Sequence, residues 1–165
     1  MYKRQTEDGA VVSDTLTATD ADAGDVLAFT IDNPVDGLSM AGDTFSFDPS
    51  HASYQALAAG ETQDVTVNYT VTDSQGATGS NSFVITVTGV NDDPVATFNA
   101  QQNVNEGDPA INGQLTSTDV DNGDTATYAD TTGGIAGLTI DGAGAFTFDP
   151  SDAAYEGLAV GDTQT

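Results

Sequence analysis

The sequence predicts an all-β protein in which one sandwich-forming unit occurs twice in tandem. The first observation is that apolar and polar residues alternate over short stretches, as in "VTVNYTVT" at 65–72, with turn-forming residues between the stretches. The second is that the chain matches itself at an offset close to one hundred residues, the length of a whole domain. Together they predict two domains in series.

The internal repeat sets the expected domain bounds. "LTATDADAGD" at 16–25 matches "LTSTDVDNGD" at 115–124 at seven of ten positions, and "FSFDPSHASYQALAAGETQ" at 45–63 matches 146–164 at twelve of nineteen. We therefore expect a first repeat at 6–93 without its first strand, and a second, truncated repeat at 94–165 without its C-terminal strands. The second repeat should be poorly stable alone, because its core lacks a covering sheet.

Strands within the unit are predicted from alternation with a period of two. Val65, Val67, Tyr69 and Val71 form one such series, and Phe83, Ile85 and Val87 form another. Further strands are expected at 16–19, 26–31 and 44–47, with turns at 36–37, 41–43 and 73–76. About seven short strands in roughly one hundred residues is typical of an immunoglobulin-like Greek-key sandwich.

One segment, "DPSHASYQALAAG" at 48–60, predicts a brief helix. Asp48 or Ser50 would cap it and Gly60 would end it. Tyr54 and Leu57 are spaced to lie on one face of this helix and to close the end of the sandwich.

Charge excludes several partners. The chain carries 26 acidic residues against two basic ones, Lys3 and Arg4, for a net charge of −24. Such a chain repels phosphate backbones and anionic lipids, so we expect neither nucleic acid nor a membrane surface as a partner. No apolar run is long enough to span a bilayer. Cations are the expected ligands. The chain has no cysteine, and in a small extracellular domain bound metal is the usual substitute for disulfides, whereas a cytosolic protein would need no substitute.

Both basic residues lie in the opening pentapeptide "MYKRQ". These five residues resemble the translation of a transposon-derived sequencing adapter, and we exclude residues 1–5 from the fold prediction on that ground. A basic N-terminus that belongs to the protein is the alternative. If the adapter interpretation holds, the chain is a piece of something longer, and the lack of a signal peptide carries no information about export.

The acidic residues gather in loops that flank the predicted strands. "TDADAGD" at 19–25 and "TDVDNGD" at 118–124 occupy matching places in the two repeats, and "NDDP" at 91–94 follows the last strand of the first. Carboxylates this close repel one another unless a hard cation lies among them, and calcium takes six to eight such oxygens. A solvated acidic loop is the alternative at each place. The candidate ligands from these loops are Asp20, Asp22, Asp25, Asn91, Asp92, Asp93, Asp119, Asp121 and Asp124.

The run "LTATDADAGD", "FSFDPS", "YQALAAGETQDVTVNYTVTDSQGAT" and "FVITVTGVNDDPVA" resembles the VCBS or bacterial cadherin-like repeat of large RTX-type adhesins, from Thr6 to the end of the chain. The resemblance implies a calcium-stiffened extender domain, exported by type I secretion and displayed at the bacterial cell surface, whose partners are neighbouring repeats of the same chain. An adhesion target, on a surface or a glycan, would be reached through other domains of the parent protein.

The unit is more distantly similar to cadherin repeats, and their calcium ligands carry over by position. The cadherin linker motif matches Asn91, Asp92 and Asp93, with Gly89 in place of its first aspartate. The Asp-x-Asp pair matches Asp119 and Asp121. Further ligands implied by this resemblance are Glu7, Glu61, although Ala59 replaces the aspartate of its motif, and Asp73, which would join Asp20 and Asp22 at a preceding boundary.

Two other function classes stay open. Enzymatic activity is not expected, because the chain has one histidine, His51, no cysteine and no basic residue beyond the adapter-like segment. A pair of carboxylates could still hydrolyse a glycoside, and a glycoside hydrolase accessory domain is a remote alternative, but the chain has no tryptophan to stack on sugar. A ligand-binding or self-adhesive immunoglobulin-like module is the nearer alternative, since fold alone does not exclude it.

Overall fold

Every regular element in the computed structural model is a β-strand, and the model describes residues 2–164. Met1 and Thr165, at the ends of the predicted segments 1–5 and 94–165, lie outside the described residues. The described part contains no helix long and apolar enough to cross a membrane. The chain divides into two units, the first comprising residues up to 92 together with 120–123, and the second comprising 93–119 and 124 onward.

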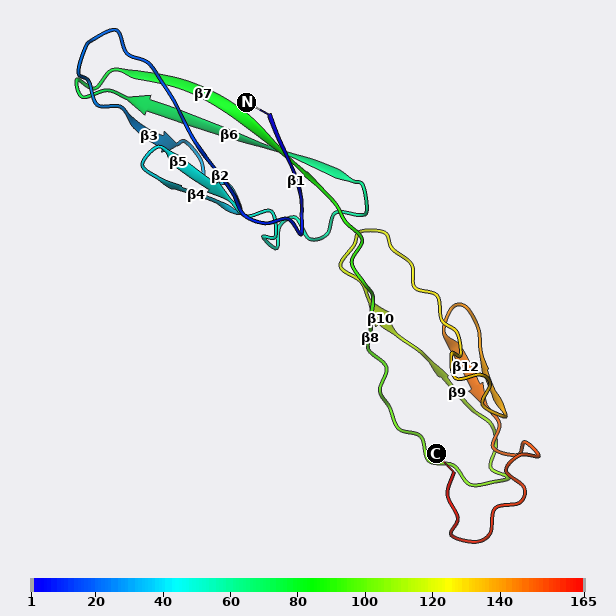
Figure 1. Cartoon of the computed structure of the whole chain (residues 1–165). Helices are drawn as coiled ribbons and strands as arrows, with labels where there is room; N and C mark the ends of the chain where they lie inside the picture. The colour runs from blue at the N-terminus through cyan, green and yellow to red at the C-terminus, as the bar shows by residue number, and fades with distance from the viewer. Residues whose placement is uncertain (1, 165) are drawn as a thin grey trace. The chain divides into compact units, whose positions relative to one another are not determined.

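Seven strands build the first unit and pair into two sheets (Figure 1). One sheet has the order β1-β7-β6-β3 and the other β2-β5-β4. The strands are β1 (Tyr2–Thr6), β2 (Val12–Thr15), β3 (Ala28–Ile31), β4 (Leu38–Ala41), β5 (Thr44–Phe47), β6 (Thr62–Thr72) and β7 (Thr78–Thr88).

The long β6–β7 hairpin confirms the predicted alternation. The two strands pair antiparallel from Thr62 with Thr88 to Thr72 with Thr78. Their inward residues, Val65, Val67, Phe83, Ile85 and Val87, are all buried. The outward residues are mostly threonine, serine and asparagine, which suit a pleated surface in contact with water.

The core of the first unit lies between these two sheets. Phe45 and Phe47 on β5 are fully buried, and the ring of Phe45 stacks on that of Phe83 with centroids 4.6 Å apart. Tyr54 and Leu57 close one end of this core, as predicted. The unit is therefore a β-sandwich with one continuous apolar interior.

The segment 48–60 differs from the prediction, since it forms successive turns and no helix. Its amide hydrogen bonds run from His51 to Asp48, from Tyr54 to His51 and from Leu57 to Tyr54. Each bond spans three residues and the bonds are three residues apart, so no i to i−4 ladder develops. Asp48 still caps the segment, because its Oδ1 accepts hydrogen bonds from the backbone and the hydroxyl of Ser50.

The predicted strand at 16–19 is also wrong, because the strand in this region is β2 at Val12–Thr15. Its ladder with β5 ends where Thr15 faces Thr44. Beyond that point Leu16 is buried and donates one backbone bond to Asp43, and the chain continues as an irregular acidic loop. The alternating residues "LTAT" at 16–19 therefore lie between β2 and the acidic loop and form no strand.

Residues 2–5 take a place in the fold, although we expected the first repeat to lack its first strand. As β1 they pair parallel with β7, from Tyr2 facing Val84 to Thr6 facing Thr88. Such pairing uses backbone groups at an open sheet edge, so it accepts many sequences. The exclusion of these residues from the fold therefore does not hold, whatever their origin.

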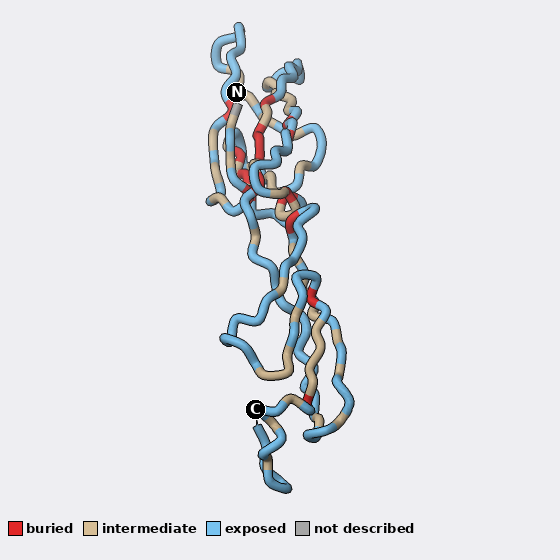
Figure 2. Tube along the Cα trace, turned by 90° about the vertical axis from the view of Figure 1, so that its right-hand side faces the viewer, coloured by how far each residue is buried: buried red, intermediate tan, exposed pale blue. Residues whose placement is uncertain are grey.

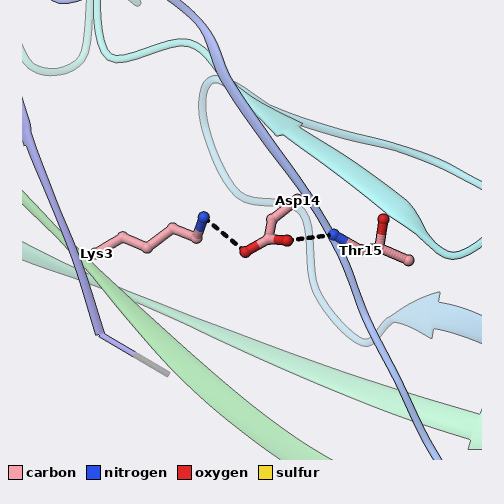
Figure 3. A network of polar contacts seen from close by, with 3 residues as sticks. All are labelled: Lys3, Asp14 and Thr15. Atoms are coloured by element: carbon pink, nitrogen blue, oxygen red, sulfur yellow. Dashed lines mark hydrogen bonds and ion pairs between the residues drawn. The ribbon is translucent and has the colours of Figure 1, made fainter.

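An ion pair of Lys3 links β1 to the β2-β5-β4 sheet (Figure 3). Its Nζ lies 2.7 Å from the Asp14 carboxylate on β2 and 5.6 Å from the centroid of the Phe45 ring. The hydrogen bond from Lys3, together with one from the Thr15 backbone N–H, lowers the pKa of Asp14 below its ordinary 3.8.

We expect Asp14→Asn to lower the free energy of unfolding by a small amount at neutral pH, because both side chains of the pair are partly exposed to solvent, Lys3 at 22% and Asp14 at 37%. The pKa of Asp14 is lower in the folded state, so its contribution is complete above the ordinary value of 3.8 and is lost as the pH falls through the lowered value. Urea unfolding of the parent and the variant at neutral pH and at acid pH measures this. A difference that stays constant down to acid pH would contradict it.

The second unit repeats part of this plan. Its three-stranded sheet β11-β12-β9 has the same pairing order as β4-β5-β2, and β10 pairs with β8. Leu138 faces Phe148 here as Leu38 faces Phe47 in the first unit. The strands are β8 (Val95–Ala96), β9 (Ile111–Gln114), β10 (Ser117–Thr118), β11 (Leu138–Ile140) and β12 (Ala145–Phe148).

The second unit lacks a buried apolar core among the described residues. Phe146 and Phe148 are only half-buried, whereas their counterparts Phe45 and Phe47 are 0% exposed. Figure 2 shows the same contrast, with buried positions mainly in the first unit. The reason is that no strands corresponding to β6 and β7 cover the β11-β12-β9 sheet in the described part of the chain.

Candidate metal centre

The parallel pairing of β1 with β7 brings two acidic segments together. Because the strands run in the same direction and Thr6 faces Thr88, the residues that follow each strand emerge at the same end of the sheet. Glu7 follows β1, and its backbone N–H donates to the Thr88 carbonyl at 3.1 Å. Its side-chain Oε1 accepts a hydrogen bond from the Val90 N–H at 2.6 Å. Glu7 is thereby fixed beside the segment that follows β7.

Three carboxylates meet at this end of the first unit. Glu7, Asp92 and Asp121 each offer an oxygen atom, and these atoms lie within 4.8 Å of one another. Asp121 is held in place by a hydrogen bond of 2.8 Å from the Asp92 N–H to its Oδ2. The loop 120–123 also donates a bond from Asn122 N to the Ala56 carbonyl.

Two of the three carboxylates in this cluster are buried and Asp92 is half-buried, which sets the cluster apart from an ordinary acidic surface. Glu7 is 0% exposed and Asp121 is 5% exposed. The second carboxylate oxygen of Glu7, Oε2, accepts no hydrogen bond from the described residues. A buried carboxylate oxygen without a partner is unfavourable unless something else neutralises it.

The electrostatics of Glu7 also indicate that its carboxylate is unfavourable without a neutralising partner. Burial raises the pKa of the Glu7 carboxyl above its ordinary 4.5, against the lowering effect of the bond from Val90. Repulsion from the nearby charges of Asp121, Asp92 and Asp8 raises the pKa further. The ionised form of Glu7 is therefore disfavoured here as long as no cation is bound.

A second cluster lies in the loop between β2 and β3. Asp20, Asp22 and Asp25 each offer an oxygen atom within 4.8 Å of the others. Asp25 accepts hydrogen bonds from Ser74 Oγ at 2.7 Å and from Gln75 Nε2 at 3.1 Å. Sequence reasoning missed these two partners, because they lie about fifty positions away and no local pattern indicates the contact. Asp20 and Asp22 are exposed, so this cluster is less enclosed than the one at Glu7.

The loop 119–124 carries the third cluster, in which Asp119, Asp121 and Asp124 lie within the same 4.8 Å limit. It repeats the spacing of Asp20, Asp22 and Asp25. Asp121 therefore belongs to two of the three groups.

Four of the sequence-predicted ligands join none of these groups. Asp73 uses its Oδ1 to accept the backbone N–H groups of Gln75 and Ala77, which closes the β6–β7 turn. Glu61 accepts a bond from the Ala58 N–H, and Asn91 donates from its side chain to the Asp92 carbonyl. Asp93 is exposed.

Gly89 stands where the cadherin motif has an aspartate, and the structure gives a reason. A Cβ atom at this buried position would collide with the carbonyl oxygens of Leu57 and Ala58. The backbone of Gly89 is also paired, since its N–H donates to Glu61 and its carbonyl accepts from Gly60. No side chain fits there, so residue 89 cannot supply a side-chain ligand.

The two packed sheets, the irregular acidic loops and the carboxylate cluster at one end define an immunoglobulin-like β-sandwich domain with a candidate cation site. Residues 2–88 match the Bacterial Ig domain family. The chain belongs to that family. No curated protein matches the chain.

Solved structures of tandem cadherin repeats are also similar. Repeats EC22–24 of mouse cadherin-23 match at 18% identity and a TM-score of 0.49, over 90% of this chain and 51% of that one. Repeats EC1–3 of protocadherin gamma C5 match at 17% identity and a TM-score of 0.47, over 94% of this chain and 56% of that one. The chain thus spans about half the length of these structures.

Proposed function

We propose that this chain is a calcium-binding extender repeat of a large bacterial surface adhesin of the VCBS or RTX type. The observation that carries the proposal is the cluster of Glu7, Asp92 and Asp121, in which Glu7 and Asp121 are buried and one oxygen of Glu7 has no partner among the described residues. Its donor atoms are all carboxylate oxygens, which suit a hard cation such as calcium. Membership of the bacterial Ig family supports a structural or binding domain over an enzyme.

In this proposal, calcium acts by neutralising carboxylates that belong to successive repeats in the sequence. Glu7 and Asp92 fall in the first repeat, and the internal match assigns Asp119, Asp121 and Asp124 to the second. Without calcium these charges repel and the repeats move freely about their junction. With calcium they become ligands of a shared ion, and the string of repeats stiffens.

The required affinity is modest for a protein outside the cell. Extracellular calcium modules work at dissociation constants of about 10⁻⁴ to 10⁻³ M. An affinity in this range fits the proposed location at the cell surface and export by type I secretion. The strongly acidic surface, with a net charge of −24, also favours cation uptake over contact with nucleic acid or lipid.

The extender role is tested by small-angle X-ray scattering of a chain that carries two complete repeats, in chelator and in millimolar calcium. We expect calcium to increase the maximum dimension and to narrow the distribution of shapes. Asp119→Asn combined with Asp121→Asn should abolish both effects. Identical scattering in the two conditions would overturn the proposal.

A ligand-binding module is the second candidate, and one observation favours it. An open groove of about 1110 Å³ lies between the free edges of β3 and β4 in the first unit. Phe29 and Ile31 from β3 and Leu38 and Met40 from β4 line it. If calcium leaves both the scattering and the stability unchanged, screening this groove for ligands becomes the next experiment.

A further inference from the structure

Asn-Gly occurs twice in the chain, and the structure places the two pairs in opposite settings. Asn112–Gly113 lies in β9, and Asn122–Gly123 lies in the loop 119–124. Asn-Gly is the dipeptide most open to intramolecular attack on the asparagine side chain, because glycine has no Cβ to obstruct it. The two pairs therefore allow a comparison within one chain.

In β9, both residues of the Asn112–Gly113 pair are constrained by β12. Asn112 faces Thr147 and Gly113 faces Phe146 in the ladder with β12. The side-chain Oδ1 of Asn112 accepts a hydrogen bond of 2.6 Å from the Thr147 hydroxyl. The ring of Phe146 lies so close to Gly113 that a Cβ there would collide with it. Attack would require this strand pair to open first.

The pair in the loop is free of these restraints. Asn122 is exposed, and Gly123 has a φ of +84° with no atom near the position of a Cβ. Within residues 2–164, the N–H of Gly123 donates no hydrogen bond. Only the backbone N–H of Asn122 is held, by the Ala56 carbonyl at 3.1 Å. Both residues of the pair are exposed to solvent.

We propose that Asn122 is a site of spontaneous deamidation, with water as the only co-reactant. The backbone nitrogen of Gly123 attacks Cγ of Asn122, a C–N bond forms, and the side-chain nitrogen leaves as ammonia with the proton from Gly123. Water then opens the cyclic imide at either carbonyl. The products are aspartate, or isoaspartate with the chain running through the former side chain.

Either product alters the acidic loop. Aspartate adds a carboxylate between Asp121 and Asp124, and isoaspartate lengthens the backbone between them by one methylene. The first repeat escapes this change, because its matching loop has Ala23 at the equivalent position. Deamidation thus changes, with age, one of two loops that share the same aspartate spacing.

The test is to incubate the purified chain at 37 °C in neutral buffer and to follow both sites by mass spectrometry. Cleavage after glutamates gives the fragment 107–156, which contains both Asn-Gly pairs. Deamidation replaces NH₂ by OH, and fragment ions show whether the resulting mass gain lies at Asn112 or at Asn122. We expect Asn122 to deamidate at least about tenfold faster than Asn112, since an opening cost of only about 1.4 kcal/mol at β9 gives that ratio.

Asn122→Ala is the matched control, because it installs the residue of the first repeat. It should remove the fast phase and leave the slow conversion of Asn112 unchanged. Electron-transfer fragmentation should find both aspartate and isoaspartate at position 122 in the parent chain. Equal rates at the two sites, or an unmodified Asn122 after the incubation, would overturn the proposal.

Discussion

Phe45→Ala should lower the free energy of unfolding of the first unit by about 3–5 kcal/mol, the cost of removing a fully buried phenylalanine. Phe45 is 0% exposed and stacks on Phe83 across the two sheets. A unit of this size is stable by about 5–15 kcal/mol, so the variant should lose a large part of its stability. Hydrogen exchange of the β6 and β7 amides in urea measures the first unit alone.

Phe146→Ala is the matched control, since residue 146 is the counterpart of residue 45 in the internal repeat. Phe146 is only half-buried, so its loss should cost about 1 kcal/mol or less, within the ordinary range for point substitutions. Equal costs for the two variants would contradict the conclusion that only the first unit has a closed core.

Gly89→Ala should destabilise the first unit by about 3 kcal/mol or more, at the upper end of the cost of overpacking a core. The added methyl group would meet the backbone carbonyls of Leu57 and Ala58, which cannot move without breaking the pairing around Glu61. Thermal unfolding of the variant measures the effect.

Gly79→Ala provides the comparison in the same part of the chain. Gly79 lies in β7, where a Cβ would make only an ordinary contact of 3.5 Å with Val71. Its substitution should change the free energy of unfolding by no more than about 0.5 kcal/mol. If both variants unfold at the temperature of the parent, the close approach at Gly89 is not a constraint on this position.

Core positions were predictable because burial follows the strand period directly. Val65, Val67 and Phe83 lie inside, as their alternation indicates. The segment 48–60 was not predictable in the same way, because its caps and its apolar spacing fit a helix and a series of turns equally well. Tyr54 and Leu57 are buried in either case, so the packing prediction holds although the predicted helix does not.

Two of the three carboxylate groups, in the loops 19–25 and 118–124, follow from the local spacing of the aspartates, whereas the group of Glu7, Asp92 and Asp121 does not. Glu7 and Asp92 come together because β1 pairs parallel with β7, a pairing that a fold prediction without residues 1–5 does not contain. Asp73 closes its own turn through two backbone bonds to its Oδ1, and its place beside Asp20 and Asp22 stays a prediction. A sequence motif gives the residue types of a site, whereas strand pairing decides which of them meet.

The central claim, that calcium binds the cluster around Glu7, is tested most directly by thermal unfolding of this chain and of Glu7→Gln, each in chelator and in calcium. Glutamine keeps the Oε1 that accepts from Val90 but carries no charge. Glu156→Gln is the control, since it removes an equal charge from an exposed residue outside the three clusters.

We expect calcium at a hundredfold excess over its dissociation constant to stabilise the parent by about 2.7 kcal/mol, or roughly 10 to 20 °C in melting temperature. The same shift should occur in Glu156→Gln and be lost in Glu7→Gln. In chelator we expect Glu7→Gln to be at least as stable as the parent, because burial and repulsion disfavour the ionised carboxylate of Glu7. A full calcium shift in Glu7→Gln, or none in the parent, would contradict the account.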